Sequence, residues 1–159
     1  MQIIPEPGFM QNLHIAFTDL HLPKQNVVRT FVAYKSKAKM IKNLLLVGAG
    51  GALGSIARYA VSLLFAHLAI SSHWATLVVN VVGSFLIGLA IPLLSGGAHL
   101  IAVVGFCGGF TTFSTFSSQA VQLFQAGERL AAAAYVAVSL VVSIAMVLLG
   151  MYVAGRLVK

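Results

Sequence analysis

Residues 105–116 read GFCGGFTTFSTF, a stretch that combines three glycines with four hydroxyl side chains. The stretch lies inside a long apolar region, in which no Lys, Arg, Asp or Glu occurs between Arg58 and Glu128. Glycine weakens a helix, and Ser and Thr side chains offer the backbone competing local hydrogen bonds. We therefore expect a membrane-embedded helix that is broken near mid-membrane within this stretch.

The composition of the whole chain is that of an integral membrane protein. Of its 159 residues, 59% are hydrophobic and 8% are charged, whereas soluble domains carry about 25% charged residues. The net charge of +7 comes from basic residues in the N-terminal stretch, beside the apolar segments and at the C-terminus. These residues form no aromatic-interleaved patch of the kind that binds nucleic acid. Lys and Arg that flank apolar segments set the orientation of the chain in the membrane and contact lipid headgroups. The expected partner is therefore the lipid bilayer and not nucleic acid.

Four apolar segments are long enough to cross a bilayer, over residues 44–65, 75–94, 100–124 and 130–153. The hydrocarbon core is about 30 Å thick and needs about 20 residues of helix. The connections are too short to hold a soluble domain, and an even number of spans places both termini on the same side. The sequence thus predicts an all-α, multi-pass membrane protein, whose four-helix transmembrane domain covers residues 40–159.

The N-terminal extension, residues 1–39, differs in composition from the rest of the chain. It holds three of the four prolines and two of the three acidic residues. No apolar run within it could cross a bilayer or form the core of a signal peptide. We expect the extension to be disordered, or to precede the true start of the protein at Met40.

Two polar side chains inside the spans have alternative interpretations. An unpartnered polar group in hydrocarbon costs several kcal/mol, so each embedded group needs a reason. Arg58 either extends to the membrane interface or draws anions to a vestibule. Asn80 either bonds across a helix pair or aims its NH₂ group into a pore. The residue types alone leave both alternatives open.

Aromatic and hydroxyl side chains recur at helical spacing. Phe113 and Phe116 are three residues apart and project from one helix face, either as core aromatics or as a lining that presents its positive ring edges. Ser139 and Ser143 form a hydroxyl stripe, unless they bond back to their own helix. Uncharged donors of this kind suit a small, strongly hydrated anion, which must exchange its water and still leave again.

Three motifs occur in order along the chain: GGALGSIARY at residues 50–59, NVVGSFLIG at 80–88 and GFCGGFTTFSTF at 105–116. Together they resemble the CrcB/Fluc family of fluoride ion channels, and the resemblance covers residues 40–159. It implies a fluoride-selective channel that passively exports fluoride across the bacterial cytoplasmic (inner) membrane and so reduces its toxicity. It also implies an antiparallel, dual-topology homodimer with two fluoride pathways and a central structural Na⁺, which is not transported.

The resemblance also implies roles for particular residues. The fluoride pathway would be lined by Asn80, Phe113, Ser114, Phe116, Ser139 and Ser143. Arg58 matches the family's arginine in the first span and would lie at a vestibule. Backbone carbonyls of Gly108 and Thr111, at the helix break, would bind Na⁺ from both subunits. The basic extension departs from the family pattern, because it would bias insertion towards one orientation, which an antiparallel dimer from one gene does not easily accept.

Other functions fit the sequence less well. A small four-helix multidrug or cation antiporter normally needs an embedded carboxylate to exchange protons for substrate. All three acidic residues of this chain lie outside the predicted spans. A structural subunit without transport would leave the clustered polar residues without a role. An enzyme is not expected, since the sequence contains no nucleophile–base pair or metal-ligand cluster.

Overall fold

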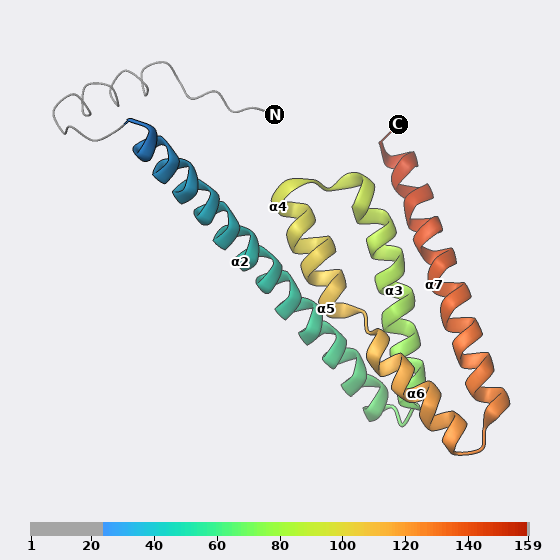
Figure 1. Ribbon diagram of the computed structural model, residues 1–159. Coiled ribbons are helices and arrows are strands. Elements are labelled where there is room, and N and C mark those ends of the chain that lie inside the picture. The colour runs from blue at the N-terminus through green and yellow to red at the C-terminus, as the bar shows by residue number, and fades with distance from the viewer. Residues whose placement is uncertain (1–23, 159) are drawn as a thin grey trace. The chain divides into compact units, whose positions relative to one another are not determined.

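The computed structural model describes residues 24–158, and side chains over residues 36–158 (Figure 1). Residues 1–23, which make up most of the predicted extension, lie outside the described residues, so the prediction for residues 1–39 stays a prediction. The chain divides into two units, Met1–Lys42 and Asn43–Lys159. The architecture and the site described below belong to the second unit.

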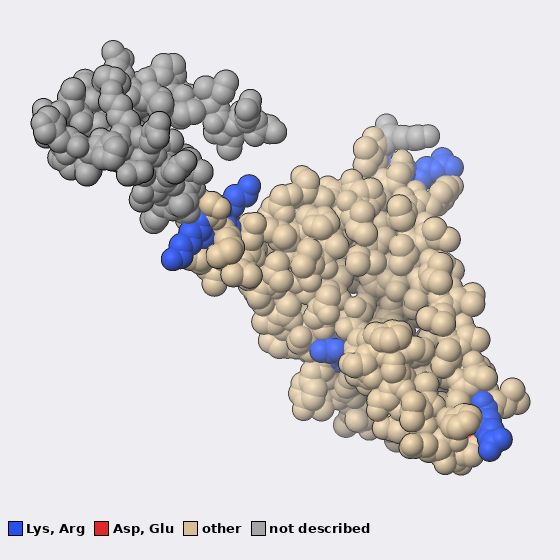
Figure 2. Space-filling model, viewed as in Figure 1, with Lys and Arg blue, Asp and Glu red and all other residues tan. Residues whose placement is uncertain are grey.

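All regular secondary structure in the described part of the chain is helical. The elements are α2 (Lys24–His67), α3 (Ser72–Leu93), α4 (Gly96–His99), the π-helix η1 (Leu100–Cys107), α5 (Gly108–Phe110), α6 (Phe113–Gln125) and α7 (Arg129–Leu157). Within the described residues, four stretches are long and apolar enough to cross a membrane, namely Ser36–His67, Ser72–Leu93, Gly96–Gln125 and Arg129–Leu157. The prediction of four span-capable helices is therefore confirmed. On the face seen in Figure 2, Lys and Arg occupy a few separate places and most of the surface is uncharged.

The third of these stretches contains two residues with extended backbone, Thr111 and Thr112, between α5 and α6. Thr112 is the N-cap of α6, and its Oγ1 accepts a hydrogen bond of 3.2 Å from the Thr115 N–H. A threonine in this position satisfies one of the donors that the first turn of a helix leaves free. The local sequence therefore starts a new helix at Phe113 and does not continue α5.

Glycines allow close packing between α2 and the helices of the third stretch. A Cβ atom at Gly54 would collide with the Phe106 carbonyl oxygen and would lie 2.8 Å from the Phe110 amide nitrogen. One turn earlier, a Cβ at Gly50 would collide with the Ile101 carbonyl oxygen. Small residues at four-residue spacing let helix backbones approach in this way.

The helices α3 and α7 lie side by side and pack through a second pair of glycines (Figure 1). A Cβ at Gly88 would collide with the Val147 carbonyl oxygen, and a Cβ at Gly150 with that of Phe85. Because both contacts are between backbones, they set the separation of the two helices that carry most of the candidate site.

Gly54→Ala is expected to destabilise the fold by about 1–3 kcal/mol, because the added methyl group forces two backbones apart. Gly48→Ala is the matched control, since Gly48 lies in the same helix with no atom within 4 Å of an added Cβ. Removing this unconstrained helical glycine should stabilise the helix by about 0.5–1 kcal/mol. Thermal unfolding of both variants in detergent measures the difference, and equal unfolding midpoints would contradict the close packing of α2.

Candidate functional site

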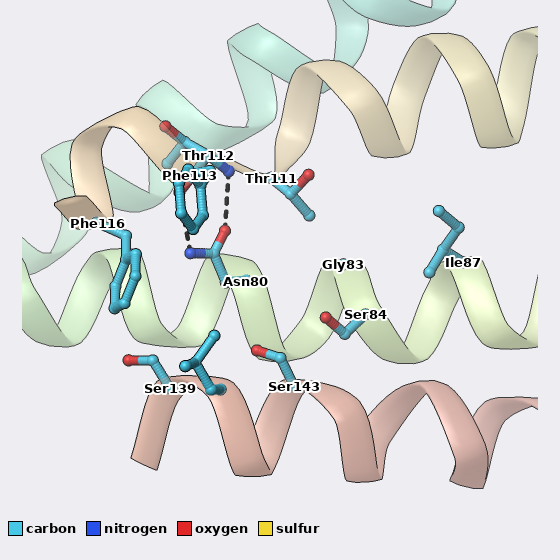
Figure 3. A pocket seen from close by; sticks show the side chains of 11 residues that line it. Asn80, Gly83, Ser84, Ile87, Thr111, Thr112, Phe113, Phe116, Ser139 and Ser143 are labelled. Carbon is cyan, nitrogen blue, oxygen red and sulfur yellow. Dashed lines mark hydrogen bonds between the residues drawn. The ribbon is translucent and has the colours of Figure 1, made fainter. Parts of the chain in front are cut away.

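Asn80 holds the extended segment between α5 and α6 against α3. Its Oδ1 accepts a hydrogen bond of 2.8 Å from the Thr112 N–H, and its Nδ2 donates one of 3.1 Å to the Thr112 carbonyl (Figure 3). The amide thus satisfies both backbone groups of Thr112, which extended backbone leaves without helical partners. A side-chain amide has two N–H donors, so one Asn80 N–H remains for another acceptor.

A pocket of about 260 Å³ lies between α3, α6 and α7, next to this amide. It is lined by Asn80, Gly83, Ser84, Ile87, Thr111, Thr112, Phe113, Phe116, Ser139, Leu140 and Ser143 (Figure 3). None of these lining residues is charged. The structure thus brings five of the six residues predicted for the pathway into one cavity, with amide, hydroxyl and aromatic groups around it.

The two phenylalanines of the pocket lie in different environments. Their ring centroids are 5.6 Å apart, and the Phe116 ring lies 5.3 Å from that of Tyr135. Phe116 is 6% exposed, whereas Phe113 is 74% exposed. Phe116 is therefore a core aromatic that also borders the pocket, while Phe113 depends little on packing within its own chain.

The serines of α7 contribute hydroxyl groups from the opposite wall. Ser139 is 5% exposed, and its Oγ has no hydrogen-bond partner among the described residues. This serine therefore does not bond back to its own helix. An enclosed hydroxyl without a partner costs about 1–3 kcal/mol, which favours a role that supplies it with an acceptor.

Ser114 is the predicted pathway residue that the structure does not place in the pocket. Its side chain is exposed, and its Oγ lies 3.4 Å from Thr112 Oγ1. Ser114 is therefore positioned beside the N-cap of α6 and outside the cavity of a single chain.

Several lining residues of the pocket were not predicted, although a helical pattern in the sequence indicates them. The lining residues of α3 follow the spacing i, i+3, i+4, i+7 and so lie on one face of the helix: Asn80, Gly83, Ser84 and Ile87. Ser84 adds a hydroxyl group four residues after the amide. Thr112 carried no such signal, because its position depends on the extended backbone.

Arg58 points towards the extended segment from α2. Its Nη1 donates a long hydrogen bond of 3.5 Å to the Thr111 carbonyl. It lines a second pocket, of about 220 Å³, together with hydroxyl groups that include those of Thr112 and Thr115. Thr112 borders both pockets, so this residue separates the cavity of Arg58 from that of Asn80.

A third pocket, of about 160 Å³, continues the second one towards the connection between α2 and α3. The two share Ser62, Ala75, Thr76 and Thr115, and the third reaches Ile70 and Ser72. A series of pockets with hydroxyl groups in both thus leads from this connection to Arg58 and the extended segment.

Backbone oxygens at the extended segment could bind a hard cation. In an unbroken α-helix the Gly108 carbonyl would accept from the Thr112 N–H, but this N–H bonds to Asn80. The Thr111 carbonyl accepts only the long bond from Arg58 among the hydrogen bonds of the described residues. Over that same part of the chain, no group of three or more His, Cys, Asp and Glu could hold a metal. Carbonyl oxygens, which hard cations prefer, are thus the ligands at hand.

Comparison with known proteins gives consistent matches. A family model described as CrcB-like protein, Camphor Resistance (CrcB), matches residues 45–151. A protein of Chlorobaculum tepidum named fluoride-specific ion channel FluC is 50% identical over 107 residues, which are 64% of this chain and 85% of that protein. Its namesake in Agrobacterium fabrum is 47% identical over 116 residues, 69% of this chain and 93% of the relative. Fluoride-specific ion channel FluC 2 of Natronomonas pharaonis is 47% identical over 114 residues, 71% of this chain and 95% of the relative.

Proposed function

The chain belongs to the CrcB family, and we infer that it is a fluoride-specific ion channel, a multi-pass membrane protein that transports and does not catalyse. Its curated relatives carry that name, and the names give no support to the antiporter alternative. The observation that carries the function is the pocket beside Asn80, which offers donors to an anion and presents no charged side chain.

The chemistry of the pocket suits fluoride because each donor is weak. A small anion holds its water strongly, so a pore must offer hydrogen-bond donors in exchange. The free Asn80 N–H and the hydroxyl groups of the pocket are such donors, and the edges of Phe113 and Phe116 carry partial positive charge. Since none of these groups carries a full charge, the ion would be held weakly enough to leave again. Its movement would be passive, down the electrochemical gradient.

Arg58 would act before the pore and not within it. Its positive charge raises the local concentration of anions in the second pocket, and the hydroxyl groups there replace part of the water. The ion would then pass Thr112 and enter the pocket of Asn80. Ser139 and Ser143 would continue the pathway along α7, and Ser114 would contribute only where a second chain closes the cavity.

The functional unit would be an antiparallel, dual-topology homodimer. The support is the exposure of Phe113, which borders the pocket and has little cover from its own chain. A second copy would close the cavity. The extended segment that interrupts the third span would then lie near mid-membrane in both copies. Carbonyls of Gly108 and Thr111 from both chains would hold a structural Na⁺, which would supply a fixed positive charge between the copies.

The place of action would be the cytoplasmic (inner) membrane of a bacterium, where passive export lowers the fluoride content of the cell. The test is growth of a bacterial strain that lacks its own fluoride exporter. Expression of this chain should restore growth at fluoride concentrations that stop the parent strain. Chain that is inserted and folded but gives no protection would overturn the proposed function.

A further inference from the structure

A pocket of about 330 Å³ lies apart from the fluoride site and shares no lining residue with it. It is formed where α3 begins, α6 ends and α7 begins, and it includes Trp74, Leu77, Leu123, Tyr135 and Val138. Of the four residues that α7 presents to it, Ala131 and Ala134 are small and leave space beside Tyr135 and Val138. Among its polar members, Ser71 and His73 are bonded to each other at 2.6 Å and the Tyr135 hydroxyl donates to Gln119 at 2.8 Å, while the buried His73 Nε2 has no partner among the described residues. The pocket therefore offers hydrocarbon surface and little polar recognition.

The surroundings of this pocket indicate what fills it. Trp74 and Val138 are 58% and 47% exposed in the single chain, and in a membrane protein apolar surface that no second copy covers faces lipid. Trp is typical of the membrane–water interface, and Trp74 stands in the first turn of α3. Arg129 is the first residue of α7 and comes two residues before Ala131, which lines the pocket. The helix end that borders the pocket thus carries a basic residue.

We propose that this pocket binds one acyl chain of a bilayer phospholipid, with the lipid phosphate near Arg129. The chain would fill space that the two alanines leave between α3, α6 and α7. The phosphate is common to all phospholipids and is attracted by a basic side chain at the membrane surface. The site would thus recognise the phosphate and the hydrocarbon, and no particular headgroup.

The single tryptophan of the chain lines this pocket and reports on it. The full chain is reconstituted in vesicles of dioleoylphosphatidylcholine, or of the same lipid with brominated acyl chains, which quench tryptophan on contact. Wild-type Trp74 should be quenched, and Ala134→Phe, which fills the pocket, should lose part of the quenching. Ala133→Phe is the matched control, because Ala133 is exposed on the same helix and does not line the pocket. This control should behave as wild type.

Two further variants keep the proposal open to refutation. Ala131→Leu fills the other end of the pocket with a smaller side chain and should also lose quenching, even if Ala134→Phe does not fold. Arg129→Gln in detergent should bind brominated phosphatidylglycerol about fivefold more weakly than wild type. Equal quenching in the pocket-filling variants, the control and wild type would overturn the acyl-chain site. Unchanged affinity in Arg129→Gln would overturn the phosphate contact. Because no step measures ion flux, the result is independent of the proposed function.

Discussion

Replacing Phe113 with Ile is expected to lower fluoride efflux by about tenfold or more, which is the effect of losing about 1.4 kcal/mol from the limiting barrier. Ile keeps the apolar volume but has no positive ring edge to offer an anion. Since Phe113 is 74% exposed in its own chain, the substitution should leave the unfolding midpoint of the chain nearly unchanged. The measurement is efflux from proteoliposomes, together with thermal unfolding of the same preparation.

Two comparisons give this prediction its controls. Phe116→Ile should lower efflux and also stability, because Phe116 is buried at 6% exposure and packs on Tyr135. Phe124→Ile changes an exposed ring on the same helix that does not line the pocket, and its efflux should equal that of wild type. If all three variants show the efflux of wild type, the rings of Phe113 and Phe116 do not contact the ion.

Asn80→Asp is expected to reduce fluoride efflux by about a hundredfold or more, since two unit charges 4 Å apart repel by about 4 kcal/mol at an effective dielectric constant of about 20. The carboxylate would still accept from the Thr112 N–H but could not donate to the Thr112 carbonyl, so the extended segment would keep one of its two bonds to α3. The pocket would gain a negative charge and lose its amide donor. Asn43→Asp, the same change outside the pocket, should leave efflux unchanged.

Asn80→Ala separates the structural role of the amide from its role towards the ion. It would leave the N–H and the carbonyl of Thr112 without their partner, at a cost of about 1–3 kcal/mol for each group. The midpoint of thermal unfolding should therefore fall clearly in Asn80→Ala and less in Asn80→Asp. If Asn80→Asp conducts like wild type, the amide is only a packing group, and its assignment to the pathway is wrong.

The four span-capable helices could be predicted because apolar length is a direct requirement of the bilayer. The ends of these helices were harder to predict. The helix that carries the first span begins at Lys24 in the structure, well before the predicted residue 44, because helix continues through a lysine-rich segment that an apolar criterion omits. The π-helix η1 could not be predicted at all. Its sequence is uniformly apolar, and its path follows backbone contacts such as that of Gly105 with Val47 and Gly50.

The candidate site was predicted in its residue types but not in its contacts. Asn80 had two alternative interpretations, and the structure shows that it makes the cross-helix bonds while one donor stays free. Its partner, Thr112, was missed because extended backbone, and not helical spacing, brings it to α3. For Arg58 the sequence left two alternatives, the membrane interface and a vestibule. In the structure its side chain points to Thr111 beside a pocket with hydroxyl groups. Ser114 followed from motif position alone, and motif position does not say which side of α6 faces the cavity.

The most direct test of an uncharged, fluoride-selective pore compares two halides in one preparation. Proteoliposomes loaded with potassium fluoride or potassium chloride are given a potassium ionophore, and the released anion is followed with an ion-selective electrode. We predict rapid fluoride efflux without a proton gradient, and chloride efflux no faster than from vesicles without protein. Equal release of chloride, or no release of fluoride from folded protein, would contradict the account.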